Sequence, residues 1–216
     1  MLIAIVDPGS GNLHSVERAI AHASSMQARP SSIVTTRDPE VIRRADRVVL
    51  PGQGAFAACR AGLDSIPGML DALSDFVLRR QRPFLGICVG MQLLAERGIE
   101  HALTPGFGWL RGQIGPINPR SEEGVDLPLP HMGWNRLEAR QSHPLMKGLD
   151  PRAHAYFVHS FAWTGGDVTD VLAGTNYGGD VIAMVGRGNL AGTQFHVEKS
   201  GQTGLTILKN FLSWTP

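Results

Sequence analysis

The sequence lacks the features that mark nucleic-acid-binding, membrane-spanning and disulfide-rich proteins. Its 216 residues carry a formal net charge of +1 and include only two cysteines. A chain so close to neutrality presents no electrostatic footprint for nucleic acid or an anionic membrane surface. The opening apolar run, residues 2–6, stops at Asp7, and no run approaches the ~20 residues that cross a bilayer. We therefore expect neither nucleic acid nor a membrane as a partner.

The scarcity of cysteine also indicates a reducing compartment. A chain of this length buries roughly 70% of its unfolded surface in one core, so it needs no disulfide framework. Cys59 stands in no motif and is interpreted as a packing residue, whereas Cys88 stands between glycines in a pattern that requires a free thiol. We expect a cytoplasmic protein whose residues 1–216 form a single domain.

The pattern of apolar residues predicts an α/β fold. Short apolar runs alternate with helical periods through the first half, which is typical of βαβ units around a mostly parallel central sheet flanked by helices. The strands are expected at residues 2–6, 32–36, 47–51 and 83–87. From about residue 109, short β-like runs broken by glycine and proline predict antiparallel strands added in the C-terminal half.

Several helices are expected from residue spacing. An apolar helical face begins at Leu13, another helix is expected over 70–77, and a last one at about 203–212. After the strand at 83–87, the apolar residues up to Ala95 predict a helix that Gly98 ends.

The strongest functional signal is the stretch Gly86-Ile87-Cys88-Val89-Gly90. Glycines two residues before and after a nucleophile permit a sharp strand-to-helix turn in which a Cβ atom at either position would clash. Such a turn projects the Cys88 side chain at a helix N-terminus and aims the Val89 amide at a developing oxyanion. A lone cysteine is more often a small buried hydrophobe, but the strand–turn–helix context favours a nucleophile.

A base for this nucleophile is offered by GTQFHVEKSG, residues 192–201. In an extended chain His196 and Glu198 share one face while Phe195 and Val197 face the core. Glu198 would then hold the imidazole through one ring nitrogen and leave the other for the thiol. Taken alone, a surface His–Glu pair is an equally good interpretation. The strand–turn–helix motif around Cys88, called the elbow below, favours a catalytic pair.

A glycine-rich loop, PGQGAF at 51–56, follows the third strand and offers backbone amides for the other half of an oxyanion hole. Alone it indicates only a turn. DPGSGN at 7–12 has neither a dinucleotide-binding glycine pattern nor a Walker lysine, and the eight histidines show no metal-ligand spacing. We expect no metal and no cofactor.

With elbow, His-x-Glu pair and oxyanion loop together, the sequence resembles the class I (triad) glutamine amidotransferases. It is more closely similar to the glutaminase subunits of imidazole glycerol phosphate synthase, over nearly the whole chain. The segments that carry this resemblance are DPGSGN-L, LPGQGAF, LGICVGMQLL, LPHMGWN, YFVHSF and GTQFHVEKSG. PHMGWN and YFVHSF separate these subunits from other amidotransferases.

The resemblance implies a role for each matching residue. Cys88, His196 and Glu198 would form the catalytic triad that hydrolyses glutamine. The remaining implied site residues are Gly52, Gln53 and Val89 at the oxyanion hole and Gln92, Tyr156, His159 and Ser160 at the substrate.

The resemblance also implies a partner. These subunits form a heterodimer with a (β/α)₈-barrel cyclase, which uses the ammonia to form imidazole glycerol phosphate and aminoimidazole carboxamide ribotide in histidine biosynthesis. Asn12 and Trp134 would lie at that interface. For Trp134, a half-buried aromatic under a loop is an equally good interpretation.

Two alternatives stay open at the level of sequence. One is the glutaminase subunit of another amidotransferase, such as that of pyridoxal-phosphate synthesis, and the other is a non-catalytic docking subunit. The chain also departs from the family pattern: Gln53 replaces the usual Val of the oxyanion loop, Val89 a Leu, and Val197 a Pro. Gln53 matters most, because a polar side chain there would change how readily the oxyanion strand reorients.

Overall fold

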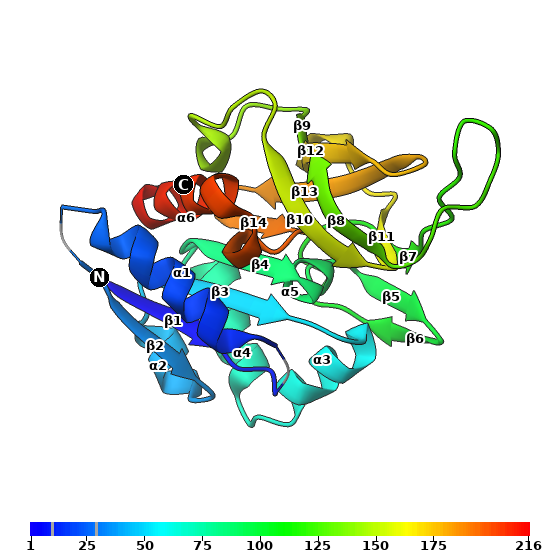
Figure 1. Cartoon of the computed structure of the whole chain (residues 1–216). Coiled ribbons are helices and arrows are strands. Elements are labelled where there is room, and N and C mark those ends of the chain that lie inside the picture. The colour runs from blue at the N-terminus through cyan, green and yellow to red at the C-terminus, as the bar shows by residue number, and fades with distance from the viewer. Residues whose placement is uncertain (10, 29) are drawn as a thin grey trace.

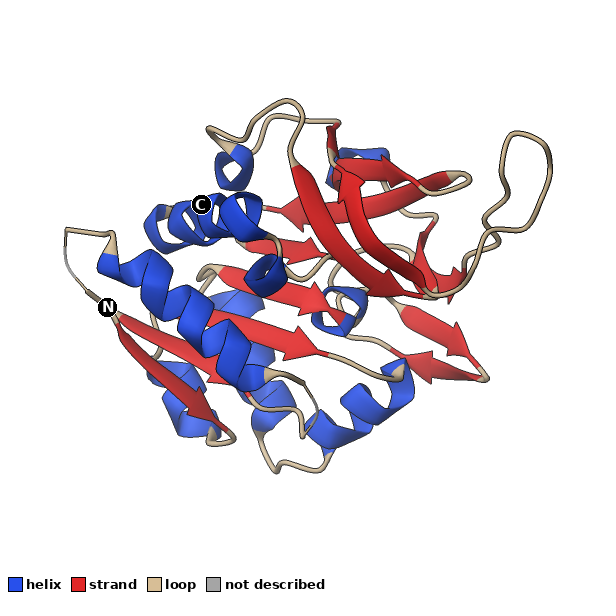
Figure 2. Cartoon of the chain, in the orientation of Figure 1, coloured by secondary structure: helices blue, strands red, loops and turns tan. Residues whose placement is uncertain are grey.

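The computed structural model describes residues 1–9, 11–28 and 30–216, so the expected turn at 7–12 includes one residue, Ser10, that lies outside the described residues. These ranges form one eight-stranded sheet and two smaller sheets (Figures 1 and 2). The order in the large sheet is β2 (Ser32–Thr36), β1 (Leu2–Val6), β3 (Arg47–Gly52), β4 (Phe84–Cys88), β14 (Leu190–Thr193), β13 (Asp180–Arg187), β12 (Val171–Asn176) and β9 (Glu138–Ala139). Strands β2 to β14 are parallel and the last three are added antiparallel. The expected α/β fold is confirmed.

The smaller sheets lie beside the carboxyl ends of β3 and β4 in Figure 1. One is an antiparallel pair of β8 (His131–Arg136) and β10 (His154–His159). The other has the order β11 (Phe161–Thr164), β7 (Gln113–Pro116), β5 (Arg97–Glu100) and β6 (Ala102–Pro105).

The helices cover both faces of the large sheet. Helices α1 and α6 pack side by side on one face, and α2 packs against α4 on the other (Figure 1). Right-handed crossovers explain this division, because the chain moves from β1 outward to β2 and then back to β3. The helices are α1 (Leu13–Ser25), α2 (Pro39–Arg44), α3 (Phe56–Asp64), α4 (Met69–Ser74), α5 (Val89–Gln92) and α6 (Gly201–Ser213). Shorter turns are the π-helical η1 (Asp75–Arg79) and the 3₁₀ turns η2 (Pro144–Met146), η3 (Val168–Asp170) and η4 (Val197–Lys199).

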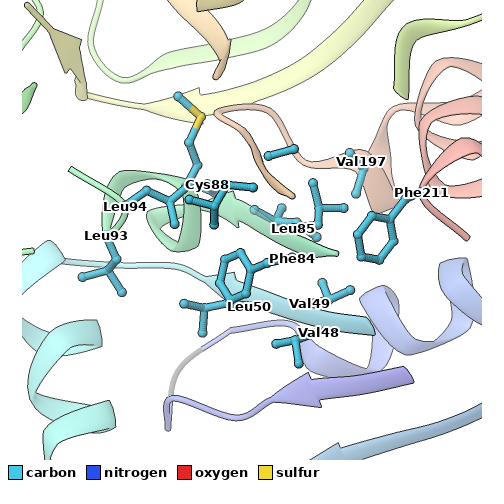
Figure 3. Close-up of a cluster of buried hydrophobic side chains, with 14 of the residues drawn as sticks. Val48, Val49, Leu50, Phe84, Leu85, Cys88, Leu93, Leu94, Val197 and Phe211 are labelled. Atoms are coloured by element: carbon cyan, nitrogen blue, oxygen red, sulfur yellow. The ribbon is translucent and has the colours of Figure 1, made fainter. Parts of the chain in front are cut away.

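The core packs around β3 and β4, and Figure 3 shows part of it, with Cys88 at the end of β4 and Phe211 of α6 among the same buried side chains. Both strands are buried over their whole length, which explains why their sequences are mainly apolar rather than alternating. Among the described residues, no helix has both the length and the apolar composition that crossing a bilayer requires.

The expected helix up to Gly98 is wrong. Helix α5 ends at Gln92, and Gly98 lies within β5. The carbonyl groups of residues 93–95, which would continue a helix, instead accept hydrogen bonds from the amides of residues 107–110 at 2.7–3.1 Å. Because these donors come from a distant segment, local spacing gave no sign of them.

Other helices differ less from expectation. The helix expected over 70–77 is present as α4, but it continues into the π-helical turn η1. Helices α2 and α3 were not predicted, and both are short, with few buried positions.

Candidate active site

The turn after β4 has the geometry that the two glycines predict. Cys88 has a φ of 55° and a ψ of −113°, a strained backbone conformation for a residue with a side chain. A Cβ on Gly86 would lie 2.4 Å from the carbonyl oxygen of Gly90, and one on Gly90 would lie 1.8 Å from that of Leu50. Only glycine at both positions lets β3, β4 and α5 approach this closely, so the steric prediction is confirmed.

The turn places Cys88 at a cavity of about 300 Å³. The cysteine is a free thiol and only 4% exposed. His196, from the far end of the sequence, lines the same cavity, and its interaction with the Cys88 side chain raises its pKa. The structure therefore brings the expected nucleophile and base together.

His196 is in turn held by Glu198. Its Nδ1–H donates to Glu198 Oε1 at 2.7 Å, and the Glu198 side chain is 2% exposed. The second carboxylate oxygen is buried without a hydrogen-bond partner among the described residues. The negative charge of Glu198 is therefore balanced mainly by the proton on His196.

The backbone around His196 and Glu198 does not form the expected extended strand. Strand β14 ends at Thr193, and His196 caps the 3₁₀ turn η4 that contains Glu198. The His196 backbone is fixed by two bonds: its amide donates to the Tyr156 carbonyl at 3.0 Å, and Ser200 Oγ donates to its carbonyl at 2.6 Å. Residues 195 and 197 are buried, as predicted.

The surroundings of His196 favour its protonated form. Burial by itself lowers the pKa of His196, but hydrogen bonds to Cys88 and Glu198 and the charges of both partners outweigh it and raise the pKa to about 10. A proton leaving the thiol is therefore accepted and retained by the imidazole, which is the charge arrangement that an activated thiol needs.

The expected oxyanion residues meet at the same turn. Val89 is the first residue of α5, so its amide has no acceptor within the helix. Gly52 ends β3 directly opposite Cys88 in the sheet register, and a Cβ on it would lie 2.9 Å from the Gly90 amide nitrogen. Gln53 is exposed and lines the cavity. Their role in binding an oxyanion stays a prediction.

Of the four expected substrate residues, Gln92, His159 and Ser160 line the cavity. Tyr156 does not: it packs on the Trp134 ring at 6.0 Å between centroids and under the Lys199 ammonium group at 5.6 Å. A substrate contact through the Tyr156 ring is therefore not supported.

The polar atoms of His159 are already used within the protein. Its Nδ1–H donates to the Phe161 carbonyl at 2.9 Å, and its Nε2 accepts from His131 Nδ1–H at 3.0 Å. Burial lowers the pKa of both histidines to about 4, and for His159 the charge of His131 adds to it. The cavity therefore has a neutral wall beside the His196 cation.

Three residues at the site were missed. Glu100 and Lys199 line the cavity with opposite charges, and the Glu100 carboxylate is anchored by accepting the Phe56 amide at 2.7 Å. Gln194 is fully buried and its Nε2 lies 3.7 Å from Cys88 Sγ. No sequence motif marks Glu100. The sequence predicts a helix that ends at Gly98, whereas Glu100 lies in strand β5. Gln194 could have been found from its position two residues before His196.

The expected interface residues are both exposed. Asn12 caps α1 by accepting the Ser15 amide at 3.2 Å, and Trp134 on β8 is 57% exposed. An exposure of that size argues against a half-buried aromatic under a loop. Within the described ranges, no group of three or more His, Cys, Asp or Glu residues is arranged to hold a metal ion.

The chain is similar to known proteins over nearly its whole length. Residues 4–214 match the family described as "Glutamine amidotransferase class-I". The "Imidazole glycerol phosphate synthase subunit HisH" of Brucella suis biovar 1 is 49% identical over 219 residues, and that of Rhodopseudomonas palustris is 52% identical, each alignment covering 100% of both chains. A solved structure described as "Crystal structure of glutamine amidotransferase" has a TM-score of 0.71 at 18% identity, covering 98% of this chain and 97% of its own. The chain belongs to the class-I glutamine amidotransferase family and, within it, to the imidazole glycerol phosphate synthase HisH subunits.

Proposed function

We propose that this chain hydrolyses glutamine to glutamate at Cys88 and delivers the ammonia to a cyclase, as the glutaminase subunit of imidazole glycerol phosphate synthase. The observation that carries the proposal is that Cys88 and His196 line one cavity of about 300 Å³ and that Glu198 holds His196 through a hydrogen bond. This cavity has the size of the smallest ligand sites, which suits an amino acid. We treat residues 1–216 as one domain that contains the whole triad.

The reaction follows from the arrangement of the three side chains. The Cys88 thiol gives its proton to His196, and the thiolate attacks the side-chain amide carbon of glutamine. The imidazolium then protonates the departing nitrogen, so that ammonia leaves and a thioester remains. Water attacks the thioester while His196 takes its proton, glutamate leaves, and the proton returns to the Cys88 sulfur. Glu198 holds the imidazole tautomer and its charge throughout.

The tetrahedral intermediate carries a negative oxygen that needs donors. The Val89 amide is one candidate, and an amide of the Gly52–Gln53 segment at the end of β3 is the other. Donors of this kind typically contribute about 10²–10³ in rate. The Gln53 side chain is exposed at the cavity, so its polarity is compatible with the role.

The charged residues at the cavity fit the two ends of an amino acid. Glu100 would receive the α-ammonium group of glutamine and Lys199 its α-carboxylate. Glu100 is already held in place by its bond to the Phe56 amide, so little side-chain freedom is lost when the ligand binds. Ser160, on the same lining, offers a hydroxyl for the same groups.

Ammonia is protonated in bulk water, so the proposal requires a partner that receives it directly. We propose a heterodimer with a (β/α)₈-barrel cyclase that closes the imidazole ring, docked on the face that carries Asn12 and Trp134. An exposed tryptophan of this kind is a typical interface anchor. Because a catalytic thiol must stay reduced, we place the complex in the cytoplasm.

The test uses the complex with its cyclase. Cys88→Ala removes the nucleophile, so glutamate release from glutamine should fall to background. Imidazole glycerol phosphate formation from added ammonium salt should continue, because that step needs only the cyclase and the intact interface. Both products are measured on the same sample, with wild type alongside.

Two outcomes would count against the proposal. Glutamate release that survives Cys88→Ala would remove the nucleophile assignment. Equal and high glutamate release by the wild-type chain with and without the cyclase would show that hydrolysis is not tied to the partner.

A further inference from the structure

Gln194 approaches the nucleophile from inside the protein. It lies just after β14, is fully buried, and its Nε2 is 3.7 Å from Cys88 Sγ. It is not among the residues that line the glutamine cavity, so it does not compete with substrate for the sulfur. A buried primary amide costs stability unless its groups are hydrogen-bonded, which raises the question of what fixes its orientation.

The orientation is set by a chain of bonds that begins at a backbone carbonyl. The Phe161 carbonyl can only accept, so the atom of the Gln92 side chain 3.1 Å from it must be the nitrogen Nε2. The same nitrogen lies 3.0 Å from Gln194, which must therefore present its oxygen Oε1 there. The opposite end of the Gln194 amide, the donor Nε2, is left facing Cys88.

The Phe161 carbonyl accepts two hydrogen bonds. The Phe161 carbonyl also accepts from His159 Nδ1–H at 2.9 Å, and His159 Nε2 accepts from His131. Both lone pairs of the carbonyl are thus occupied, and neither glutamine can turn its amide over without placing two donors or two acceptors together. The donor next to the sulfur is preorganised by groups on helix α5 and on the strands β8, β10 and β11.

We propose that Gln194 is a catalytic residue that donates an amide N–H to Cys88 Sγ and stabilises the thiolate formed when the thiol proton passes to His196. Gln92, which also lines the cavity, then acts as a positioning residue for Gln194 in addition to its expected role in binding glutamine. This inference rests on the proposed function of Cys88 as a nucleophile. The donor favours the charged sulfur over the neutral thiol, because hydrogen bonds to an ionised group are about twice as strong as neutral ones.

The test follows the ionisation of the sulfur and needs neither glutamine nor the cyclase. The rate at which iodoacetamide alkylates Cys88 in the full chain is measured from pH 5 to 10, with the modified peptide identified by mass spectrometry so that Cys59 does not contribute. Gln194→Met keeps the length of the side chain and removes the donor. We expect the midpoint of its pH profile to move up by about one unit and alkylation below that midpoint to slow about tenfold.

The matched control is Thr193→Val. Thr193 is equally buried and its hydroxyl donates to the Phe195 carbonyl at 2.9 Å, not to the sulfur. This variant loses one internal hydrogen bond of the same segment and should keep the wild-type alkylation profile. A shift shared by both variants would overturn the proposal, because it would reflect general loosening of the segment.

A second variant covers the case in which Gln194→Met does not fold. Gln194→Glu keeps the shape but offers oxygen in place of the donor nitrogen, and it should shift the midpoint in the same direction. A wild-type profile in either folded variant would overturn the proposal. The result is distinct from a failure of the proposed function, because glutamate release can be absent while alkylation still depends on Gln194.

Discussion

Acidification from pH 7.5 to 5 should destabilise the fold through His131 and His159. Both are buried, and burial lowers the pKa of each from its ordinary 6.5 to about 4. Between these two values the unfolded chain binds protons that the folded chain does not, so stability is fully present above pH 6.5 and is lost as the pH falls towards 4. His196 has the opposite sign: its raised pKa stabilises the fold below pH 6.5, and this is lost as the pH rises to about 10.

The magnitude follows from the size of the pKa change. A histidine with a pKa of 6.5 in the unfolded chain and about 4 in the folded one contributes roughly 2 kcal/mol less to stability at pH 5 than at pH 7.5. His131 is 2% exposed and His159 is 6% exposed, so solvent screening reduces this figure little. The two together form a large part of the 5–15 kcal/mol that stabilises a typical domain.

The comparison variant is His131→Phe. The His131 ring is stacked between Phe157, at 4.8 Å between centroids, and Tyr177, at 4.0 Å, so a phenyl ring keeps this packing and removes one titrating group. The variant should be less stable than wild type at pH 7.5, because His159 loses its donor, and the gap should shrink by about 2 kcal/mol at pH 5. His196 is present in both proteins, so its contribution cancels.

The measurement is urea unfolding of both proteins at pH 7.5 and 5. The dependence of the unfolding free energy on urea concentration should be the same in all four experiments. If wild type and His131→Phe lose the same stability between these pH values, the histidine pair is not held neutral and the reasoning fails.

Two further predictions concern the triad and the partner face. Glu198→Gln keeps an acceptor for the His196 Nδ1–H but removes the negative charge, so glutamate release should fall by about 10²–10⁴. An unchanged rate would separate Glu198 from catalysis. Trp134→Ala removes a side chain that is 57% exposed, so the urea midpoint should change little while cyclase binding, measured by titration calorimetry, weakens at least tenfold; unchanged affinity would place the interface elsewhere.

The sequence alone was sufficient for features that depend on neighbouring residues. The parallel strands β1 to β4 are short, contain apolar or β-branched runs and are bounded by turn residues, and each lies within a residue of its predicted bounds. The elbow was predictable because a Cβ atom on Gly86 would clash with the backbone of Gly90, and both glycines lie within the same five residues. The three residues of the proposed triad were predictable because the motifs that contain them are local, although η4 replaces the expected strand around His196.

Features that depend on distant segments could not be predicted. Helix α5 stops early because residues 107–110 donate to the carbonyl groups that would continue it. Glu100 reaches the cavity only because β5 follows that early stop. His131 meets His159 through the register of β8 on β10, which a single sequence does not specify. In each case the missing information is a tertiary contact rather than a propensity.

Strand β8 carries two residues whose predicted effects are different, His131 and Trp134. Its residues alternate, so His131 points inward to His159 while Trp134 is exposed and packs on Tyr156. The two side chains share no contact, since His131 is stacked on Phe157 and Tyr177. Effects of changing them should therefore separate: His131→Phe should alter the pH dependence of unfolding and leave cyclase binding intact, and Trp134→Ala should do the reverse. One strand thus holds the cavity residue His159 from one side and presents an exposed face on the other, because the period of two in a β-strand gives it two independent sides.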